Sequence, residues 1–402
     1  MAQASQCFWS PVDPPFDLPM KLALASAVTL TQGADVVVLL RHCVRSPYAT
    51  LRANRAAPGF EYPDNYTSQA FPTEWGTEQA QCTPRGLDMA ERLGLGLLEH
   101  LPAPVVVRAD NVTRCVATAG KVASGLGMDP KEVKVQQQYF DPAAAQVCPD
   151  LTGDQYNASI EEQLKIAQDK TSYLGELWAQ REELITELQE MVGRGPAPAL
   201  GDIPDKISGG YYVGGMYVAS QGMLETFLLE AGNGMSVAWG ALDGDKREEL
   251  YTKWQGLNVL YNRINHGGTG ISTRYGGATA WRVLNALEDP AVGSEVLVGH
   301  DFNLDGVAKM ADLYWQCGKY AANSAQPLQG LAFRRVEQGI VMAAICVDYE
   351  AAYSGNALFG AVQMGSQNVT ETPVLAADLR KSVANRIDFA CVQNDTAADV
   401  LV

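Results

Sequence analysis

Two histidines in this sequence follow short apolar segments directly and stand beside residues that bind anions. The pair Arg41-His42 ends one apolar run, and the pair His300-Asp301 follows another, more than 250 positions later. Arginine forms paired hydrogen bonds to phosphate oxygens, an imidazole can attack phosphorus, and a carboxylic acid can protonate a leaving alcohol. These residue types therefore predict phosphoryl transfer through a phosphohistidine, without a metal.

Two further arginines are expected at the same place. Arg45 follows the first histidine by three positions, and Arg114 enters a helical pattern that follows a third apolar run. Ligands of open α/β sheets bind at the carboxyl ends of the strands. If the three apolar runs are neighbouring strands, three arginines, two histidines and one aspartate converge on one crevice.

Cys43 offers a second nucleophile next to His42. In tyrosine-phosphatase-type enzymes an arginine stands six positions after the cysteine, whereas Ala49 occupies that position here. The spacing cannot build the same phosphate cradle, so the chemistry is assigned to the histidine. Cys43 is then either a small buried thiol or half of a disulfide.

The apolar runs are short and rich in β-branched residues, which is typical of buried strands. Four such strands are expected, at 35–40, 104–107, 295–298 and 340–347. Helical patterns at 86–100 and 114–125 alternate with them. This alternation predicts an α/β fold with a largely parallel central sheet flanked by helices.

The middle of the chain has a different sequence pattern. Helical patterns occupy 160–192, 217–231 and 246–264, and this span contains no strand pattern. We expect a smaller all-α domain inserted over the active site. The chain then divides into a first α/β part at 1–150, an α-helical cap at 151–265 and a second α/β part at 266–402.

The composition limits the partners. The 402 residues include 30 basic and 46 acidic side chains, a net charge of −16. Such a chain is not expected to bind nucleic acid, and no apolar run reaches the roughly 18 residues of a membrane span. The apolar stretch Met20–Leu30 is interpreted as the lead-in to the first strand, with any secretion signal removed. Eight cysteines favour an oxidising compartment.

Two motifs resemble those of a known family. The sequence RHCVRSP at 41–47 resembles the RHGxRxP signature of the histidine acid phosphatases, and GHDFNL at 299–304 resembles their distal HD motif. Similarity extends roughly from residue 34 to the C-terminus and is strongest to the bacterial periplasmic branch that contains phytases and glucose-1-phosphatase. Other matching stretches are 83–86, 108–126, 219–229 and 232–240.

The resemblance assigns a role to each candidate residue. His42 becomes the nucleophile and Asp301 the proton donor, with no cofactor and no metal. The phosphate ligands implied are Arg41, Arg45, Arg114 and His300. Glu225 falls on a residue that lines the pocket from the α domain, and Gln255 falls loosely where phytases often carry a histidine. The resemblance also implies a disulfide between Cys148 and Cys391.

The sequence departs from the family pattern at three places. Cys43 replaces the glycine of the signature, and Tyr48-Ala49 stands where phytases often have threonine and lysine. Phe302 replaces a small hydroxyl residue after the HD pair. Arg52 or Arg55 could take the place of the missing lysine. These departures weaken the expectation of phytate as substrate more than that of a phosphomonoester.

The resemblance therefore implies an acid phosphomonoester hydrolase with a phosphohistidine intermediate, phytase-like and periplasmic or secreted. A sugar-phosphate phosphatase such as a glucose-1-phosphatase, or a broad-specificity acid phosphatase, is the alternative. A catalytically silent binding protein is a third hypothesis, which the complete set of candidate residues disfavours. The expected partner is a small phosphomonoester, with no nucleic acid and no membrane insertion.

Overall fold

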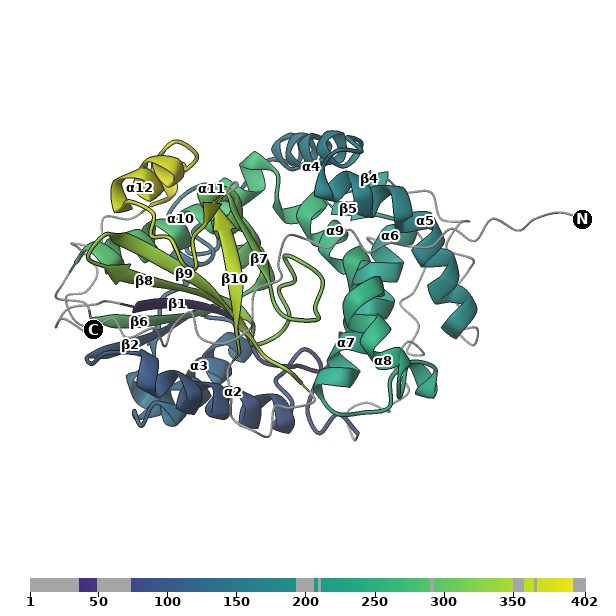
Figure 1. The fold of residues 1–402 in the computed structure, drawn as a ribbon, viewed down its shortest axis with the longest axis horizontal. Coiled ribbons are helices and arrows are strands. Elements are labelled where there is room, and N and C mark those ends of the chain that lie inside the picture. The colour runs from purple at the N-terminus through teal and green to yellow at the C-terminus, as the bar shows by residue number, and fades with distance from the viewer. Residues whose placement is uncertain are drawn as a thin grey trace, which may run out of the picture.

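The computed structural model describes residues 36–48, 74–192, 206–208, 211–289, 293–349, 358–364 and 367–392. Within these ranges, helices lie on both sides of a central sheet, and a separate helical part adjoins one end of that sheet (Figure 1). The interpretations of Met20–Leu30, Ala49, Arg52 and Arg55 concern positions outside the described residues.

The described residues form a nine-stranded mixed sheet, ordered β11-β10-β9-β8-β1-β6-β2-β3, with β7 also paired to β10. Its parallel half contains β1 (Val36–Arg41), β6 (Ser294–Gly299), β2 (Val105–Ala109) and β3 (Lys134–Val135). Its antiparallel half contains β7 (Leu313–Gln316), β8 (Gly330–Val336), β9 (Gly339–Cys346), β10 (Leu358–Met364) and β11 (Gln367–Asn368). All four predicted strands are present, as β1, β2, β6 and β9.

Strand β1 lies in the middle of the sheet and is buried along its whole length. Its six residues, VVVLLR, are all buried, and it pairs with β6 on one side and β8 on the other. Because helices cover both faces of the sheet, the strand needs no polar face, which explains the uninterrupted apolar run.

Helices pack on the two faces of the sheet. In Figure 1, α2 (Pro84–Leu97) and α3 (Thr113–Gly125) lie below it, and α10 (Thr269–Glu288), α11 (Asp301–Ala311) and α12 (Ala376–Ala384) lie above it. Helix α2 begins where its sequence predicts, because the Thr83 hydroxyl accepts a hydrogen bond from the Gly86 amide at 2.9 Å and Pro84 follows this cap. Short 3-10 turns span Leu98–His100, Pro130–Glu132, Gln137–Tyr139, Ala238–Gly240 and Phe389–Cys391.

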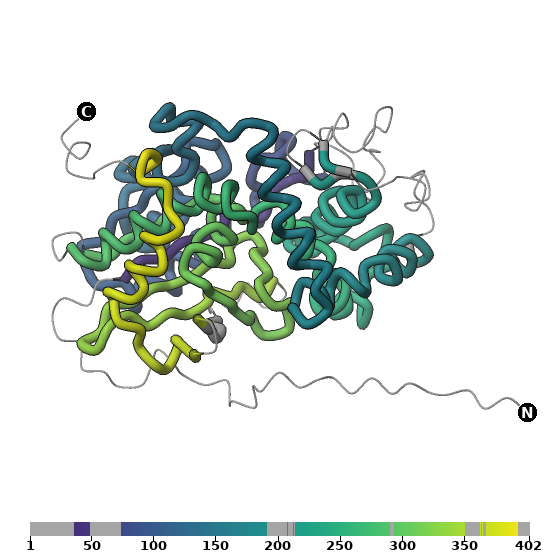
Figure 2. The backbone as a smooth tube through the Cα atoms, turned by 90° about the horizontal axis from the view of Figure 1, so that it is seen from above, coloured from purple at the N-terminus to yellow at the C-terminus, as the bar shows by residue number. Residues whose placement is uncertain are grey.

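The helical part contains α4 (Gly153–Ala167), α5 (Tyr173–Val192), α6 (Gly215–Tyr217), a π-helix (Val218–Leu224), α7 (Glu225–Gly232), α8 (Lys246–Glu249), a second π-helix (Leu250–Trp254) and α9 (Gln255–His266). Figure 2 shows these helices gathered beside the sheet. The division of the chain at 150 and 265 stays a prediction.

Two expectations for this helical part were wrong. The single helix expected at 160–192 is two helices, because side chains form a turn between them: Asp169 accepts from the Thr171 amide, and the Ser172 hydroxyl accepts from the Gly175 amide. A short hairpin of β4 (Lys206–Ser208) and β5 (Tyr211–Val213) lies where no strand was expected. Runs of three residues are too short to show a period of two.

In the described part of the chain, three disulfides connect distant segments: Cys43–Cys82, Cys148–Cys391 and Cys317–Cys346. The pairing of Cys148 with Cys391 confirms the expectation from the resemblance. Of the two interpretations of Cys43, the disulfide is correct. Among the described cysteines, Cys115 is the one without a disulfide partner, and it is buried.

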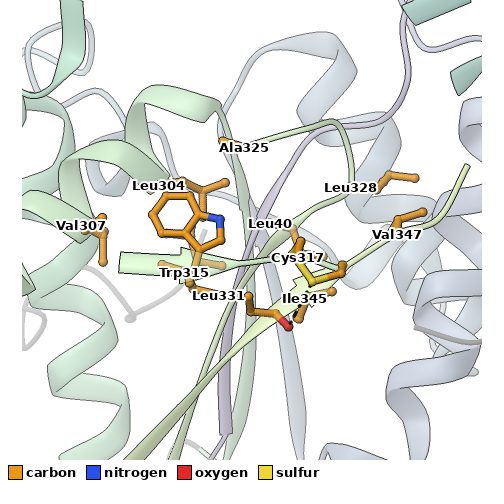
Figure 3. Close-up of a cluster of buried hydrophobic side chains, with 14 of the residues drawn as sticks. Leu40, Leu304, Val307, Trp315, Cys317, Ala325, Leu328, Leu331, Ile345 and Val347 are labelled. Carbon is orange, nitrogen blue, oxygen red and sulfur yellow. Dashed lines mark hydrogen bonds between the residues drawn. A yellow bond between two sulfur atoms is a disulfide. The ribbon is translucent and has the colours of Figure 1, made fainter. Parts of the chain in front are cut away.

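An apolar cluster lies beneath the carboxyl end of β1. Figure 3 shows Leu40 of β1 near Trp315, Leu331 and Ile345 from the antiparallel half. The Leu328 amide, at the edge of this cluster, donates to the Arg41 and His42 carbonyls at 3.2 and 3.1 Å. The core therefore fixes the backbone from which the candidate nucleophile projects. No described helix is both long enough and apolar enough to span a bilayer.

Candidate active site

The register of the parallel strands brings the two histidines together. Arg41, the last residue of β1, pairs with Gly299, the last residue of β6, so His42 and His300 leave the sheet side by side. Their ring centroids are 5.3 Å apart, and both side chains are buried. The predicted convergence at the carboxyl ends of these strands is present in the structure.

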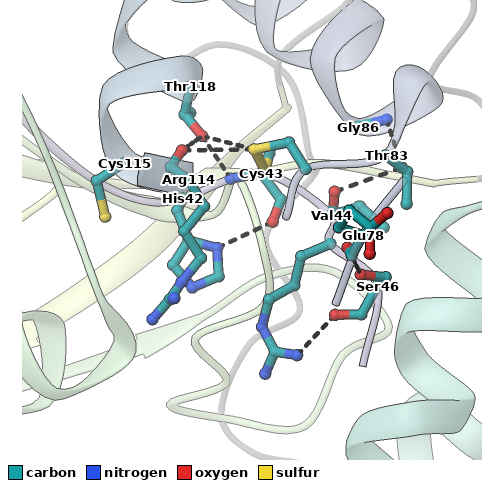
Figure 4. Close-up of a disulfide and its surroundings, with 12 residues drawn as sticks. His42, Cys43, Val44, Ser46, Glu78, Thr83, Gly86, Arg114, Cys115 and Thr118 are labelled. Atoms are coloured by element: carbon teal, nitrogen blue, oxygen red, sulfur yellow. Dashed lines mark hydrogen bonds between the residues drawn. A yellow bond between two sulfur atoms is a disulfide. The ribbon is translucent and has the colours of Figure 1, made fainter. Parts of the chain in front are cut away.

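The loop after β1 is tied to the start of α2. The disulfide Cys43–Cys82 joins them, the Ser46 amide donates to the Gln81 carbonyl at 2.9 Å, and the Thr83 amide donates to the Val44 carbonyl at 3.0 Å. Figure 4 shows this disulfide directly beside His42, with Thr118 of α3 accepting from the Cys43 amide. The loop that carries His42 and Arg45 is therefore held by covalent and backbone contacts.

His42 is neutral and presents one free ring nitrogen. Its Nδ1 lies 3.0 Å from the Cys43 carbonyl oxygen (Figure 4), and a carbonyl only accepts, so the proton resides on Nδ1. Burial and the positive charge of Arg114 and neighbouring groups lower the pKa of His42 well below its ordinary value. The Nε2 lone pair is therefore available for attack at acidic pH.

Three arginines surround this imidazole. Arg41 Nη1 donates to the Ala325 carbonyl at 2.7 Å, Arg45 Nη1 donates to the Ser46 carbonyl at 3.1 Å, and Arg114 Nη2 lies 3.4 Å from His300 Nδ1. Each guanidinium also has a buried Nε–H for which the described residues provide no acceptor. Unsatisfied charged donors are costly to bury, so their convergence indicates a site for an anion.

Glu225, the first residue of α7, reaches the arginines from the helical part. Its Oε1 accepts from Arg41 Nη2 at 2.6 Å and from Arg45 Nη2 at 3.3 Å, and its side chain is buried. This contact places the helical part over the site, as expected for an inserted cap. The carboxylate offsets part of the positive charge and holds the two guanidiniums in a fixed orientation.

His300 is held by a carboxylate that the sequence interpretation missed. Its Nε2 lies 2.8 Å from Asp110 Oδ2, and both side chains are buried. Burial lowers the pKa of His300 below its ordinary value, and the bond to Asp110 acts in the opposite direction. Asp110 directly follows β2, so the same rule that selected the histidines could have found it.

Asp301 begins α11 and faces Arg41. Its Oδ2 lies 3.2 Å from Arg41 Nη2, and its Oδ1 accepts from the Phe302 amide at 3.0 Å. Burial alone would raise the pKa of this carboxyl, but the charges of Arg41 and two histidines outweigh burial and hold the pKa below its usual range. In this state Asp301 is ionised.

Two of the described positions that depart from the family pattern, Tyr48 and Phe302, border the site. Tyr48 lies against Arg45, with the guanidinium carbon 4.7 Å from the ring centroid. Phe302 stacks on His300, with ring centroids 4.7 Å apart and ring planes 21° apart. Each of these two rings packs on an arginine or a histidine of the candidate site. At both positions the resemblance predicts a residue that forms hydrogen bonds instead.

Gln255, the remaining position that the resemblance singled out, lies outside this cluster, as does His100. Gln255 is buried, but its side chain bonds to Ser324 and to the Ala321 amide. His100 lies near Glu99 at the surface. His266 is half-buried, and its Nδ1 lies 3.3 Å from Oδ2 of Asp305, one turn after Asp301 in α11. Its contact with Asp305 was not foreseen because α9 and α11 meet only in the fold.

A group of side chains with metal-ligand chemistry adjoins the cluster. Asp110, Cys115 and His300 place one ligand atom each within 4.8 Å of one another. They come from the end of β2, the first turn of α3 and the residue after β6. Because His300 is far in sequence from Asp110 and Cys115, no Cys/His spacing indicated them.

Comparison with solved structures identifies the fold. The phytase of Hafnia alvei in complex with myo-inositol hexakis sulphate aligns with a TM-score of 0.71 and 19% identity, over 91% of this chain and 100% of that chain. The Klebsiella sp. ASR1 phytase aligns with a TM-score of 0.73 and 19% identity, over 92% and 99%. The Citrobacter braakii phytase gives 0.70 and 19%, over 90% and 100%. No family model and no curated protein matches the sequence. The chain has the fold of these phytases.

Proposed function

We propose that the protein is a phosphomonoester hydrolase that acts through a phosphohistidine at His42, with an inositol polyphosphate as substrate. One observation carries the proposal: a neutral imidazole with a free Nε2 stands among three guanidiniums whose buried Nε–H groups have no acceptor among the described residues. A phosphate dianion supplies both the acceptors and the negative charge that this arrangement needs.

The proposed reaction uses the side chains of the cluster in the following order. Nε2 of His42 attacks phosphorus, the P–N bond forms, and the P–O bond to the leaving alcohol breaks in line with it. Arg41, Arg45, Arg114 and His300 hold the three equatorial oxygens as the charge redistributes. Water then attacks the phosphohistidine, inorganic phosphate leaves, and His42 is regenerated.

Asp301 is the proposed proton donor, and its ionised state in the structure needs an explanation. Arg41 holds its pKa down across 3.2 Å. When the guanidinium binds a phosphate dianion, it stabilises the carboxylate less, and the added negative charge raises the carboxyl pKa. Substrate binding thereby protonates Asp301, which donates this proton to the leaving oxygen and takes one back from the attacking water.

The choice of substrate rests on the solved structures that share the fold. The Hafnia, Klebsiella and Citrobacter proteins are phytases, and the first of them holds an inositol hexakis sulphate. Sulphate groups on an inositol ring have the shape of phosphate groups, so a pocket of this kind fits an inositol polyphosphate. Comparing kcat/KM for phytate and for glucose 1-phosphate tests this choice; a clear preference for glucose 1-phosphate contradicts it.

We propose that the protein works outside the cytoplasm, in the periplasm or after secretion. The support is the three disulfides among the described residues, since such bonds persist in oxidising compartments. One of these disulfides, Cys43–Cys82, lies directly beside His42, so an oxidising compartment would also preserve a bond within the candidate site.

Rapid mixing with a labelled phosphomonoester, followed by a quench at alkaline pH, tests the intermediate. We expect acid-labile, base-stable label on His42 in the wild-type protein and none in His42→Ala. The chelator EDTA should leave the activity unchanged, because no metal takes part in the steps above. A fully active His42→Ala variant would contradict the proposal.

Asp301→Asn tests the proton donor. Alkyl phosphates such as phytate need a protonated leaving oxygen, whereas p-nitrophenolate leaves unaided. We expect turnover of phytate to fall by roughly 10²- to 10⁴-fold and that of p-nitrophenyl phosphate far less. Equal losses for both substrates would argue against the acid role.

A further inference from the structure

Cys115 lies against the candidate active site without a role in the proposed reaction. It stands in the first turn of α3, directly after Arg114, and it is fully buried. Its Sγ is 3.5 Å from His300 Nε2 and 3.5 Å from the Gly299 carbonyl oxygen. The same imidazole nitrogen lies 2.8 Å from Asp110 Oδ2.

We infer that Asp110, Cys115 and His300 form a binding site for a soft divalent cation, with Zn²⁺ as the best fit. The three donors are a thiolate, an imidazole nitrogen and a carboxylate oxygen, all within 4.8 Å of one another and all buried. This mixture favours Zn²⁺ or Co²⁺ over Mg²⁺ or Ca²⁺, which prefer sets of oxygen ligands.

One ligand–ligand distance matches tetrahedral coordination, a second is close to it, and the third, between sulfur and carboxylate oxygen, is at most 4.8 Å. With Zn–S near 2.3 Å and Zn–N near 2.0 Å, a tetrahedral angle separates sulfur and nitrogen by about 3.5 Å. The separation of Cys115 Sγ and His300 Nε2 is 3.5 Å. The nitrogen and carboxylate oxygen, now 2.8 Å apart, need to separate by about 0.5 Å, a small side-chain adjustment. Three protein ligands leave the fourth position to water.

Charge and protons also balance. The metal displaces the thiol proton, which leaves to solvent, and the S–H bond is replaced by a metal–sulfur bond. The carboxylate of Asp110 and the thiolate of Cys115 together neutralise a divalent cation in this buried place. The imidazole proton moves from Nε2, which becomes a ligand, to Nδ1.

This proton shift has a consequence for Arg114. Its Nη2 lies 3.4 Å from His300 Nδ1. Once the metal fixes the proton on Nδ1, this nitrogen can no longer accept from Arg114 Nη2, so the contact that positions the guanidinium before substrate binds is lost. Since the proposed function makes Arg114 a phosphate ligand, occupation of the metal site should inhibit hydrolysis; this second step rests on that proposed function, whereas metal binding does not.

Titration of the full-length, EDTA-treated protein with Co²⁺ tests the site directly. A thiolate ligand gives a near-ultraviolet charge-transfer band, which we expect to saturate at one equivalent in the wild type. Cys115→Ala and Cys115→Ser should lose the band, and the serine variant keeps the side-chain size if the alanine variant folds poorly. Cys7→Ala is the matched control and should retain it, because Cys7 lies outside the described residues and carries no part of the argument. No band in the wild type, or an equal band without Cys115, overturns the site.

Inhibition is measured separately with Zn²⁺ and p-nitrophenyl phosphate, since phytate itself binds metals. We expect activity to fall at least tenfold at saturating Zn²⁺ in the wild type and to change less than twofold in Cys115→Ser. Equal inhibition of both proteins overturns the link to Arg114 while the cobalt band still decides the site. A protein with no phosphatase activity but a cobalt band refutes the proposed function alone.

Discussion

His42 and His300 are two buried imidazoles at equivalent strand ends, yet their ring nitrogens have different partners. His42 donates from Nδ1 to a neutral backbone carbonyl, which leaves Nε2 free. His300 bonds through Nε2 to the carboxylate of Asp110 and turns Nδ1 toward Arg114. An imidazole that donates to a neutral acceptor keeps its other ring nitrogen as a base, whereas a carboxylate partner stabilises the positively charged form of the imidazole. Residue type and strand position are therefore the same for both, and the hydrogen-bond partner is what distinguishes the proposed nucleophile from the proposed phosphate ligand.

Replacing each histidine by alanine is expected to give the largest difference in kcat between the two positions. His42→Ala removes the atom that bonds to phosphorus, so kcat should fall on the order of 10⁴- to 10⁶-fold. His300→Ala removes one donor to the phosphate oxygens, and kcat should fall about 10²- to 10³-fold. Steady-state kinetics with p-nitrophenyl phosphate measure both values. Equal losses, with phosphoenzyme still formed in His42→Ala, would reverse the assignment.

Asp110→Asn is expected to have the next largest effect. The amide keeps the shape of the side chain but no longer stabilises a positive charge on His300, so kcat/KM should fall about 10- to 100-fold. Because the effect passes through a phosphate ligand, most of it should appear in KM. Labelling of His42 by substrate should persist. Loss of labelling would place Asp110 with the nucleophile instead.

The pH dependence of kcat/KM tests the charge around His42. Burial and positive neighbours lower its pKa below the ordinary 6.5. The neutral form is the one that acts as the proposed nucleophile. Activity should therefore persist below pH 6.5 and decline only as the pH falls through the lowered pKa.

Arg114→Gln removes the charge that contributes most to this effect after burial. The pKa of His42 should rise, and the acidic limb of the profile should move to higher pH by less than the roughly 1–3 units of a close charge pair. The shift is read from kcat/KM over pH, independently of the overall loss of activity. A limb that stays in place would mean that another group titrates there.

The smallest effect on rate is expected from the disulfide beside His42. Removing it by Cys43→Ala with Cys82→Ala loosens the peptide whose carbonyl orients His42. Since backbone bonds still hold the loop, kcat should fall less than about tenfold, or about 1.4 kcal/mol. Calorimetry should show a stability loss of about 2–4 kcal/mol.

The matched control for this pair is Cys148→Ala with Cys391→Ala. It opens a much longer loop, with a separation of 243 residues against 39, so the chain-entropy model predicts the larger stability loss. Its kcat should not change while the protein stays folded. If both double variants lose rate in proportion to stability, the disulfide beside His42 has no particular influence on the nucleophile.

Sequence was sufficient for the parts of the site that follow strands. Arg41, His42 and the pair His300-Asp301 stand after apolar runs, and their convergence needs only the rule for parallel strand ends. Strands β1, β2, β6 and β9 were found for the same reason, since short β-branched apolar runs between polar residues are typical of buried strands.

Other features depend on contacts that no short segment reveals. Strand β8 was missed because its second half, with Arg334 and Arg335, is polar and hides the apolar beginning. The bond from Asp110 to His300 and the pairing of Cys43 with Cys82 join segments whose distance only the fold sets.

The turn that separates α4 from α5 is different, because the sequence alone could have predicted it. The segment from Asp169 to Ser172 is a polar stretch with turn-forming side chains.

The bond between Cys148 and Cys391 also determines how the chain responds to a protease. It closes a covalent ring that contains the described helices from α4 to α12, while His42 and Arg114 lie on the segment before it. A single cut anywhere between the two cysteines opens the ring without releasing a piece. The fragment with the nucleophile stays bonded to the fragment that ends the fold, and only reduction separates them. A nicked molecule therefore keeps His42 and Arg114 covalently joined to the residues on both sides of the cut.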